Sequence, residues 1–275
     1  MKRRGTTFIL LLVFVIGFSL LLYPTFSDWW NSMHQSRAVA SYVEKVADID
    51  SDKYEQLWND AWDYNTSLMG KKNNYVLDEK QKDEYNHLLD IGGTGVMGYI
   101  EIPIIGVTLP IYHGTDEAVL QIAIGHLEWT SLPVGGENSH CVVSGHRGLP
   151  SARLFTDLDK LVVGDIFMFR VLDEILTYEV DQILIVKPHE TESLMIEEGK
   201  DLCTLITCTP YGINSHRLLV RGHRVENVEE AKSVRVTSDA IQIEPVIVAP
   251  LVALPILLIL LIGLLFPKPR RRRFE

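Results

Sequence analysis

The chain of 275 residues is acidic, with a formal net charge of −10, and the charge is unevenly distributed. Residues 2–4 carry +3 and residues 268–275 carry +4, so the part between them carries −17. An acidic surface of this kind disfavours nucleic acid as a partner and tight adsorption to anionic lipid. Three cysteines are too few, and odd in number, for a disulfide framework.

Each end of the chain carries an apolar run with basic residues on its outer side, Phe8 to Tyr23 and Val246 to Phe266. The second run is long enough to span a bilayer, and the first reaches that length when it extends over Gly5 to Phe26. The basic flanks predict that both termini are cytoplasmic and that the part between them is outside the cell membrane. A cleaved signal peptide is the alternative for the first run, but no small-x-small site directly follows it.

Helical spacing of apolar residues follows the first run. Residues 39–49 have this spacing, and Ser51-Asp52 is a plausible N-cap for a second helix that ends near Gly70. We expect this pair to form a helical stalk packed against the main domain. The segment Lys71 to Lys82 is polar and lacks periodicity, so it is predicted to be a loop.

From Gly95 onward the pattern changes to short apolar strands separated by Gly, Pro, Asn or Asp. Many short strands at this spacing are typical of a closed barrel or a sandwich, and the pattern does not choose between them. The predicted strands are Val96 to Ile102, Val107 to Ile111, Cys141 to Ser144, Asp165 to Val171, Thr177 to Val186, Cys203 to Cys208 and Arg217 to Val225.

The stretch from Asp201 to Val225 contains a candidate nucleophile. A buried strand ends at Cys208, a loop rich in Pro, Gly and Asn follows, and a second strand begins at Arg217. If the two strands pair through that loop, the Cys208 thiol lies close to the Arg217 guanidinium. The cation favours the thiolate and can hold a developing oxyanion.

A candidate base follows another short strand, Ser139 to Ser144. His146 lies between two glycines just past that strand, which predicts an exposed position at a strand end. Among the nine histidines, His146 is preferred for its Gly-flanked position, and His223, on the strand face shared with Arg217, is the second candidate. Cysteine, histidine and arginine at three strand ends are the parts of a cysteine transpeptidase or protease.

Several motifs resemble those of the sortase family. TLITC, ending at Cys208, resembles the TLxTC signature, and SGHRG around His146 and the position of Arg217 match the family's other two catalytic residues. TSLPVGG, SGHRGLPSARLFTDL and TPYGINSHRLLVRGHR resemble class C sortases, which assemble pili, over residues 93–225. The resemblance implies a mainly β fold, an eight-stranded sortase barrel, here with N-terminal helices and a transmembrane helix at each end.

The resemblance also implies the reaction and the partners. Cys208, His146 and Arg217 would cleave the Thr–Gly bond of an LPxTG-like sorting signal through a thioacyl-enzyme intermediate. The acceptor would be a lysine amine of another pilin, on the surface of a Gram-positive cell, and no cofactor is needed. We take His126, Ser144 and Thr207 as candidate substrate-binding residues, although a histidine such as His126 also commonly bonds to backbone.

Class C sortases usually carry a lid built on an Asp-Pro-aromatic motif after the N-terminal helices. The candidate residues here are Asp78 and Tyr75, but no proline follows the acid and the aromatic residue precedes it. An exposed ion pair from Asp78 to Arg217 would add only about 0–1 kcal/mol. We therefore predict that the usual lid is missing and that Cys208 is open to solvent or covered only by a mobile segment.

A metal site formed by Cys203, Cys208 and a histidine is disfavoured, because residues five apart on a strand face opposite ways and no C-x-x-C pattern occurs. Cys141, in the middle of a strand, is most simply a small core residue. We predict no metal.

Three other functions are weighed against pilin polymerisation. A wall-anchoring sortase is the nearest. A surface protein that is itself a sortase substrate would need the motif Leu-Pro-x-Thr-Gly before the C-terminal apolar run. This motif is absent from the sequence. A non-catalytic membrane-anchored binding module gives no reason for a thiol, an imidazole and a guanidinium at three strand ends.

The sequence divides into six predicted parts. They are a signal anchor (1–27), a helical stalk with the lid-region loop (28–92), the catalytic barrel (93–228), a linker (229–245), a C-terminal transmembrane helix (246–266) and a basic cytoplasmic tail (267–275).

Overall fold

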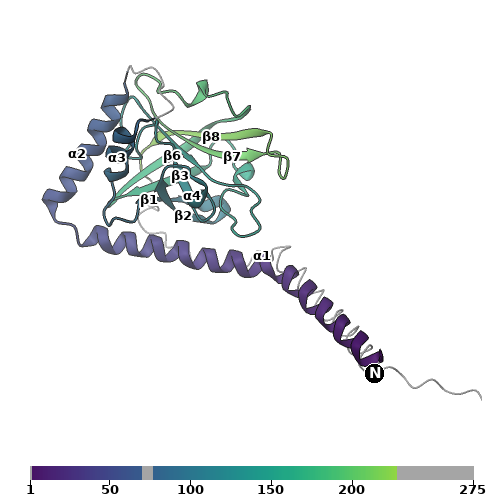
Figure 1. Cartoon of the computed structure of the whole chain (residues 1–275). Helices are drawn as coiled ribbons and strands as arrows, with labels where there is room; N and C mark the ends of the chain where they lie inside the picture. Colours follow the sequence, from purple (N-terminus) through teal and green to yellow (C-terminus); the bar gives the residue numbers. More distant parts are fainter. Residues whose placement is uncertain (1, 70–76, 228–275) are drawn as a thin grey trace, which may run out of the picture.

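Eight strands close into a barrel in the order β1-β2-β3-β4-β7-β8-β6-β5. Figure 1 shows the barrel with the N-terminal helices beside it. The structure is a computed structural model, and it describes residues 2–69 and 77–227. The predicted C-terminal transmembrane helix therefore lies outside the described residues. Neighbouring strands are antiparallel except for β2–β3 and β4–β7, which are parallel. The strands are β1 Val96–Ile102, β2 Val107–His113, β3 Ile124–His126, β4 Ser139–Ser144, β5 Ile166–Val171, β6 Glu174–Val186, β7 Asp201–Thr209 and β8 His216–Val225.

The seven predicted strands are confirmed with small changes at their ends, and β3 is the strand that the sequence pattern missed. All three residues of β3 are buried, so this short segment shows no alternation between apolar and polar residues. Its pairing to β2 and β4 closes the barrel on that side. Short helical turns fill the connections: α4 Glu117–Leu120, η1 Pro103–Ile105, η2 Leu158–Lys160 and η3 Glu192–Leu194.

Three longer helices precede the barrel: α1 Lys2–Ala47, α2 Ser51–Leu68 and α3 Glu79–His87. The N-cap of α2 is Asp50, one residue before the predicted Ser51-Asp52, because the Asp50 carboxylate accepts the Lys53 N–H. The loop predicted over Lys71 to Lys82 is wrong from Glu79 onward. There Asp78 and Gln81 form a capping box, a local signal that outweighs the missing apolar periodicity.

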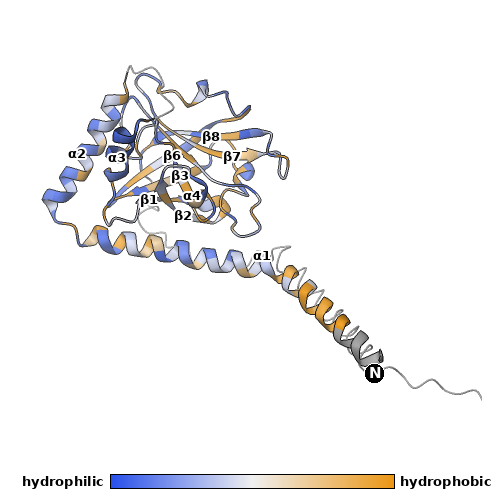
Figure 2. Ribbon diagram, viewed as in Figure 1, coloured by the Kyte–Doolittle hydropathy of each residue, from blue (hydrophilic) through white to orange (hydrophobic). Residues whose placement is uncertain are grey.

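Helix α1 runs unbroken through the predicted anchor and stalk, with Pro24 inside it. Its apolar side chains from Ile9 to Tyr23 are largely exposed, whereas its second half follows the barrel (Figure 2). Within the described part of the chain, α1 is the one helix long and apolar enough to cross a membrane.

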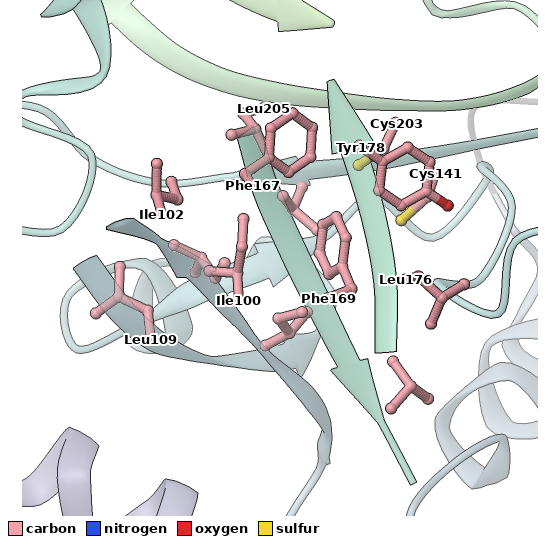
Figure 3. Close-up of a cluster of buried hydrophobic side chains, with 14 of the residues drawn as sticks. Ile100, Ile102, Leu109, Cys141, Phe167, Phe169, Leu176, Tyr178, Cys203 and Leu205 are labelled. Atoms are coloured by element: carbon pink, nitrogen blue, oxygen red, sulfur yellow. The ribbon is translucent and has the colours of Figure 1, made fainter. Parts of the chain in front are cut away.

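Apolar side chains fill the barrel interior, as in the stacked and edge-on rings of Phe167, Phe169 and Tyr178 (Figure 3). Cys141 on β4 and Cys203 on β7 lie opposite each other in the parallel pair and belong to the same core. The interior is therefore packed, which leaves the strand ends and the outer face for a site.

Candidate active site

Cys208 and Arg217 lie directly opposite each other on β7 and β8, as the sequence predicts. Both are near the turn that joins the strands, where residues 210–215 are exposed and Asn214 has a φ of 58°. Asparagine tolerates this left-handed conformation better than most residues. Only residues 210–215 separate β7 from β8, and a connection this short restricts the register in which the two strands pair. The Cys208 side chain is partly exposed, and the guanidinium of Arg217 is its cross-strand neighbour.

His146 leaves the same end of the barrel as Cys208. Strands β4 and β7 are parallel, with Ser144 opposite Ile206, so two further residues along each chain bring His146 level with Cys208. His146 is partly exposed, and its Nε2 lies 4.0 Å from Oε2 of Glu117 on α4. No residue in the described ranges makes a hydrogen bond to that Nε2. The tertiary fold thus brings the three predicted catalytic residues to one rim.

Two bonds tie the start of the His146 loop to β7. The Gly145 N–H donates to the Ile206 carbonyl at 3.0 Å, and the Thr207 hydroxyl donates to the Gly145 carbonyl at 2.8 Å. Both partners on β7 lie within two residues of Cys208. The loop that carries the imidazole is therefore fixed to the strand that carries the thiol.

The guanidinium of Arg217 is held by its own turn. Its Nη1 donates to the carbonyls of Asn214 and His216 at 3.3 and 3.1 Å. The side chain also forms part of the wall of a cavity of about 230 Å³. A guanidinium with a fixed position at a cavity wall is suited to stabilising negative charge on a bound carbonyl oxygen.

The cavity has an apolar floor on the outer face of the barrel. Outward-facing side chains of β4, β7 and β8 form a small cluster there, separate from the barrel core. Polar groups, Ser144 and Arg217 among them, surround this floor. The apolar lining residues are Leu120, Leu127, Trp129, Val186, Pro188, Leu194, Ile206 and Leu219.

Comparison with known proteins identifies the fold and the chemistry. The Sortase domain family model matches residues 100–225. Sortase C1 from Streptococcus agalactiae is 52% identical to this chain, covers 70% of it and 100% of its own length, and superposes with a TM-score of 0.68. The chain belongs to the sortase family. Its structural neighbours are class C sortases, and like other sortases it is a cysteine transpeptidase.

Two further relatives agree with this assignment. Sortase C of Streptococcus pneumoniae is 45% identical, covers 70% of this sortase and 97% of its own chain, and has a TM-score of 0.63. Sortase A of Bacillus anthracis is 27% identical over 225 residues, which are 82% of this chain and 96% of that protein.

The three candidate substrate-binding residues have different surroundings in this sortase. Ser144 is partly exposed and lines the cavity. Thr207 is buried and bonded to the His146 loop. His126 is fully buried, with its ring nitrogens bonded to the Tyr85 hydroxyl at 2.9 Å and the Ser131 carbonyl at 2.8 Å. Of the three, Ser144 is the one that lines the cavity, whereas His126 and Thr207 are buried and hydrogen-bonded within the domain.

The other two thiols of the sortase are unsuited to nucleophilic attack. Cys141 and Cys203 are buried in the barrel core, so a substrate cannot reach either sulfur. Desolvation opposes ionisation of Cys141, but hydrogen bonds from Cys203 and His126 outweigh it and lower its pKa. Desolvation, with Cys141 as neighbour, raises the pKa of Cys203 well above its ordinary value. No group of three or more metal-ligating side chains occurs in the ranges that the structure describes. Cys208 is the accessible thiol.

A bridge that the sequence analysis missed joins the His146 loop to the end of β7. Nη2 of Arg147 bonds Oδ2 of Asp159 at 2.5 Å, and Nη1 donates to the Thr209 hydroxyl at 3.3 Å. The Tyr211 ring lies against Gly148, where an added Cβ would come within 2.6 Å of the ring. Arg147 adjoins His146 in sequence, but its partners are 12 and 62 residues away, so no local pattern indicates them.

The structure describes one of the two candidate lid residues, Asp78. Asp78 is the N-cap of α3, and its carboxylate accepts the Gln81 N–H at 2.8 Å. Tyr75 lies outside the described residues. Helix α3 is bound to the barrel by the ion pair between Lys82 and Glu128 at 3.1 Å. The prediction of a missing lid therefore stays a prediction.

We expect Cys208 of the resting sortase to react with iodoacetamide at a rate that changes less than about fivefold when residues 71–76 are replaced by a Gly-Ser sequence of equal length. The reason is that the thiol is partly exposed and that an exposed ion pair contributes only about 0–1 kcal/mol to holding a loop closed. The replacement stops before Leu77, because a longer one would remove the capping box of α3. Mass spectrometry of the labelled protein measures the rate, and a strong acceleration would show that a lid exists.

Proposed function

We propose that this sortase joins pilin subunits through Cys208, His146 and Arg217. The observation that carries the proposal is the meeting of these residues at one rim of the barrel, where Arg217 also lines a cavity with an apolar floor. The substrate would be an LPxTG-like sorting signal, whose leucine and proline suit the apolar floor. The acceptor would be a lysine amine of a second pilin.

In the first half of the reaction, the Cys208 thiolate attacks the threonine carbonyl carbon of the sorting signal. The carbonyl oxygen becomes an oxyanion, which Arg217 stabilises. The imidazolium of His146 donates its proton to the glycine nitrogen, the C–N bond breaks, and the glycine peptide leaves as an amine. A thioester between Cys208 and threonine remains.

In the second half, the lysine amine of the acceptor pilin attacks the thioester carbonyl. Neutral His146 accepts a proton from this amine, the oxyanion again lies beside Arg217, and the Cys208 thiolate leaves. The product is an isopeptide bond, and the thiolate–imidazolium pair is restored. No cofactor is required for either half.

The names of two structural neighbours support pilins as the substrate class. The sortase C of Streptococcus pneumoniae is described with respect to pilin substrate specificity. A 41% identical neighbour, which covers 71% of this chain with a TM-score of 0.63, is the sortase C1 of GBS pilus island 1. Anchoring of surface proteins to the cell wall is the second candidate function, since it uses the same thioacyl intermediate and a different amine.

The experiment that tests the proposal offers both acceptors to the enzyme. The full-length sortase in detergent is incubated with a recombinant pilin that carries an LPxTG-like signal, with and without a short glycine peptide as wall-type amine. We expect a ladder of covalent multimers on denaturing gels, even in the presence of the glycine peptide. Release of the signal with transfer only to the glycine peptide would favour wall anchoring, and no cleavage would contradict both functions.

We further propose that the apolar half of α1 anchors the sortase in the cell membrane and that the barrel is outside the cell. The exposed apolar side chains of α1 and the indoles of Trp29 and Trp30, placed where the apolar run ends, support this arrangement. The division into an anchor, a helical stalk, a barrel from 93 to 228, a linker, a second transmembrane helix and a basic tail is part of the same proposal.

Protease added to intact cells is expected to digest the central domain and to spare tags placed before Met1 and after Glu275. The basic residues on the outer side of each apolar run keep both termini in the cytoplasm. Immunoblotting for each tag before and after detergent lysis measures the protection. Loss of the C-terminal tag in intact cells would contradict this topology.

A further inference from the structure

Helix α1 makes two hydrogen bonds to the loop that follows His146. The Asp28 carboxylate accepts the backbone N–H of Arg153 at 2.9 Å, and the Asn31 amide donates to the carbonyl of Ser151 at 2.7 Å. Asp28 and Asn31 are about one helical turn apart on the same face of α1. The helix thus contacts peptide groups within seven residues of His146 in sequence.

The loop that α1 contacts has its two ends joined by a backbone hydrogen bond. The Phe155 N–H donates to the His146 carbonyl at 3.1 Å, so residues 146–155 form one compact unit. Leu154, between the bond to α1 and the bond to His146, has a φ of 38°, a conformation that non-glycine residues rarely adopt. Strained backbone of this kind persists only where surrounding contacts hold it in place. The α1 bond to Arg153 is the contact immediately before it.

Helix α1 is itself fixed to the barrel at a second place. The Tyr42 hydroxyl donates to the Met97 carbonyl at 3.1 Å and accepts the Leu172 N–H at 2.7 Å. Between Asp28 and Tyr42 the helix is continuous, and it lies along the barrel before its apolar half turns away (Figure 1). The apolar segment, the contact with the His146 loop and the contact with the barrel core therefore belong to a single helix.

We propose that Asp28 and Asn31 are positioning residues through which the anchor helix α1 holds His146 in its reactive place relative to Cys208. The helix that reaches the membrane is then part of the catalytic scaffold, and loss of its two bonds to the loop slows the chemical steps without weakening substrate binding. The inference rests on the proposed role of His146. It assigns to α1 a function beyond anchoring.

The test uses the full-length sortase in phosphatidylcholine nanodiscs and a quenched fluorescent peptide with an LPxTG motif as the probe. Asp28→Leu, which removes the acceptor for the Arg153 N–H, is expected to lower kcat roughly tenfold with an unchanged KM, because a small misplacement of a catalytic group affects the chemical step. Asp28→Asn keeps an acceptor oxygen and is expected to restore kcat to within about twofold of the normal value. Asn31→Leu is expected to act in the same direction as Asp28→Leu.

Thermal unfolding separates positioning from a general loss of stability. The unfolding temperature of each variant is measured in the same nanodiscs, and the kinetic assay is run well below it. Lys45→Met is the matched control: it removes another bond from α1 to the domain, Nζ to the Gly92 carbonyl at 3.4 Å, and is expected to leave kcat unchanged.

Two outcomes would contradict the proposal that α1 positions His146. One is a normal kcat in Asp28→Leu. The other is an equal loss in Asp28→Asn and in Lys45→Met, which would mean that any change in α1 acts through stability. His146→Ala in the same assay tests the proposed function separately: if it retains turnover, the catalytic assignment fails, whereas an inactive His146→Ala beside a normal Asp28→Leu removes only the inference about α1.

Discussion

Replacement of Cys208 by alanine is expected to abolish thioacyl formation and covalent polymers altogether. Cys208 is the accessible thiol, it lies opposite the cationic Arg217, and it is the last residue but one of the strand that holds the His146 loop. Without the sulfur no acyl intermediate forms, and neither water nor the acceptor amine attacks the peptide carbonyl at a rate comparable to that of the Cys208 thiolate. Gel analysis of pilin multimers, together with mass spectrometry of the enzyme after incubation with substrate, measures the effect.

The other two cysteines supply matched controls for this prediction. Cys141→Ala and Cys203→Ala remove sulfur from the barrel core and are expected to lower stability by about 1 kcal/mol each while retaining at least part of the activity. The assay is therefore run well below the unfolding temperature of each variant. Multimers formed by Cys208→Ala, or activity lost only in a folded Cys203→Ala enzyme, would remove Cys208 from the proposal.

Replacement of Arg217 by lysine is expected to lower turnover of a fixed sorting peptide roughly 100-fold, although the charge is conserved. The guanidinium is held by two carbonyls of its own turn, and an ammonium on a flexible stem loses that fixed orientation. Loss of one oxyanion donor typically costs about 10²–10³ in kcat. Steady-state kinetics with the quenched LPxTG peptide measures the effect, and a near-normal kcat would exclude Arg217 from the catalytic residues.

Arg221→Lys provides the comparison on the same strand. Arg221 bonds the carboxylates of Asp181 and Glu197, and a lysine still offers a positive charge to both. We expect turnover within about threefold of the normal value. A similar fall in both variants would indicate that β8 tolerates no loss of a guanidinium, which would leave no specific role for Arg217.

The position of Cys208 opposite Arg217 was predictable from the sequence, because a short loop between two apolar strands restricts their register. The start of α3 was equally local, since Asp78 and Gln81 form its capping box, but the prediction weighed periodicity and missed it. The sortase motifs added the expectation of a barrel and of His146 as the base. The predicted bounds of most strands agree with the structure for the same local reasons.

Only the tertiary structure decided which distant segments meet at the rim. His146 is level with Cys208 because β4 and β7 pair in parallel, although some sixty residues of chain separate them, and no pattern in either strand encodes that partnership. The bond from Arg147 to Thr209 and the bonds from α1 to the His146 loop depend on the same closure of the barrel. Turns, caps and alternation arise from neighbouring residues and can be predicted from them. The geometry of the site arises from contacts between segments far apart in sequence, which exist only once the barrel is closed and packed.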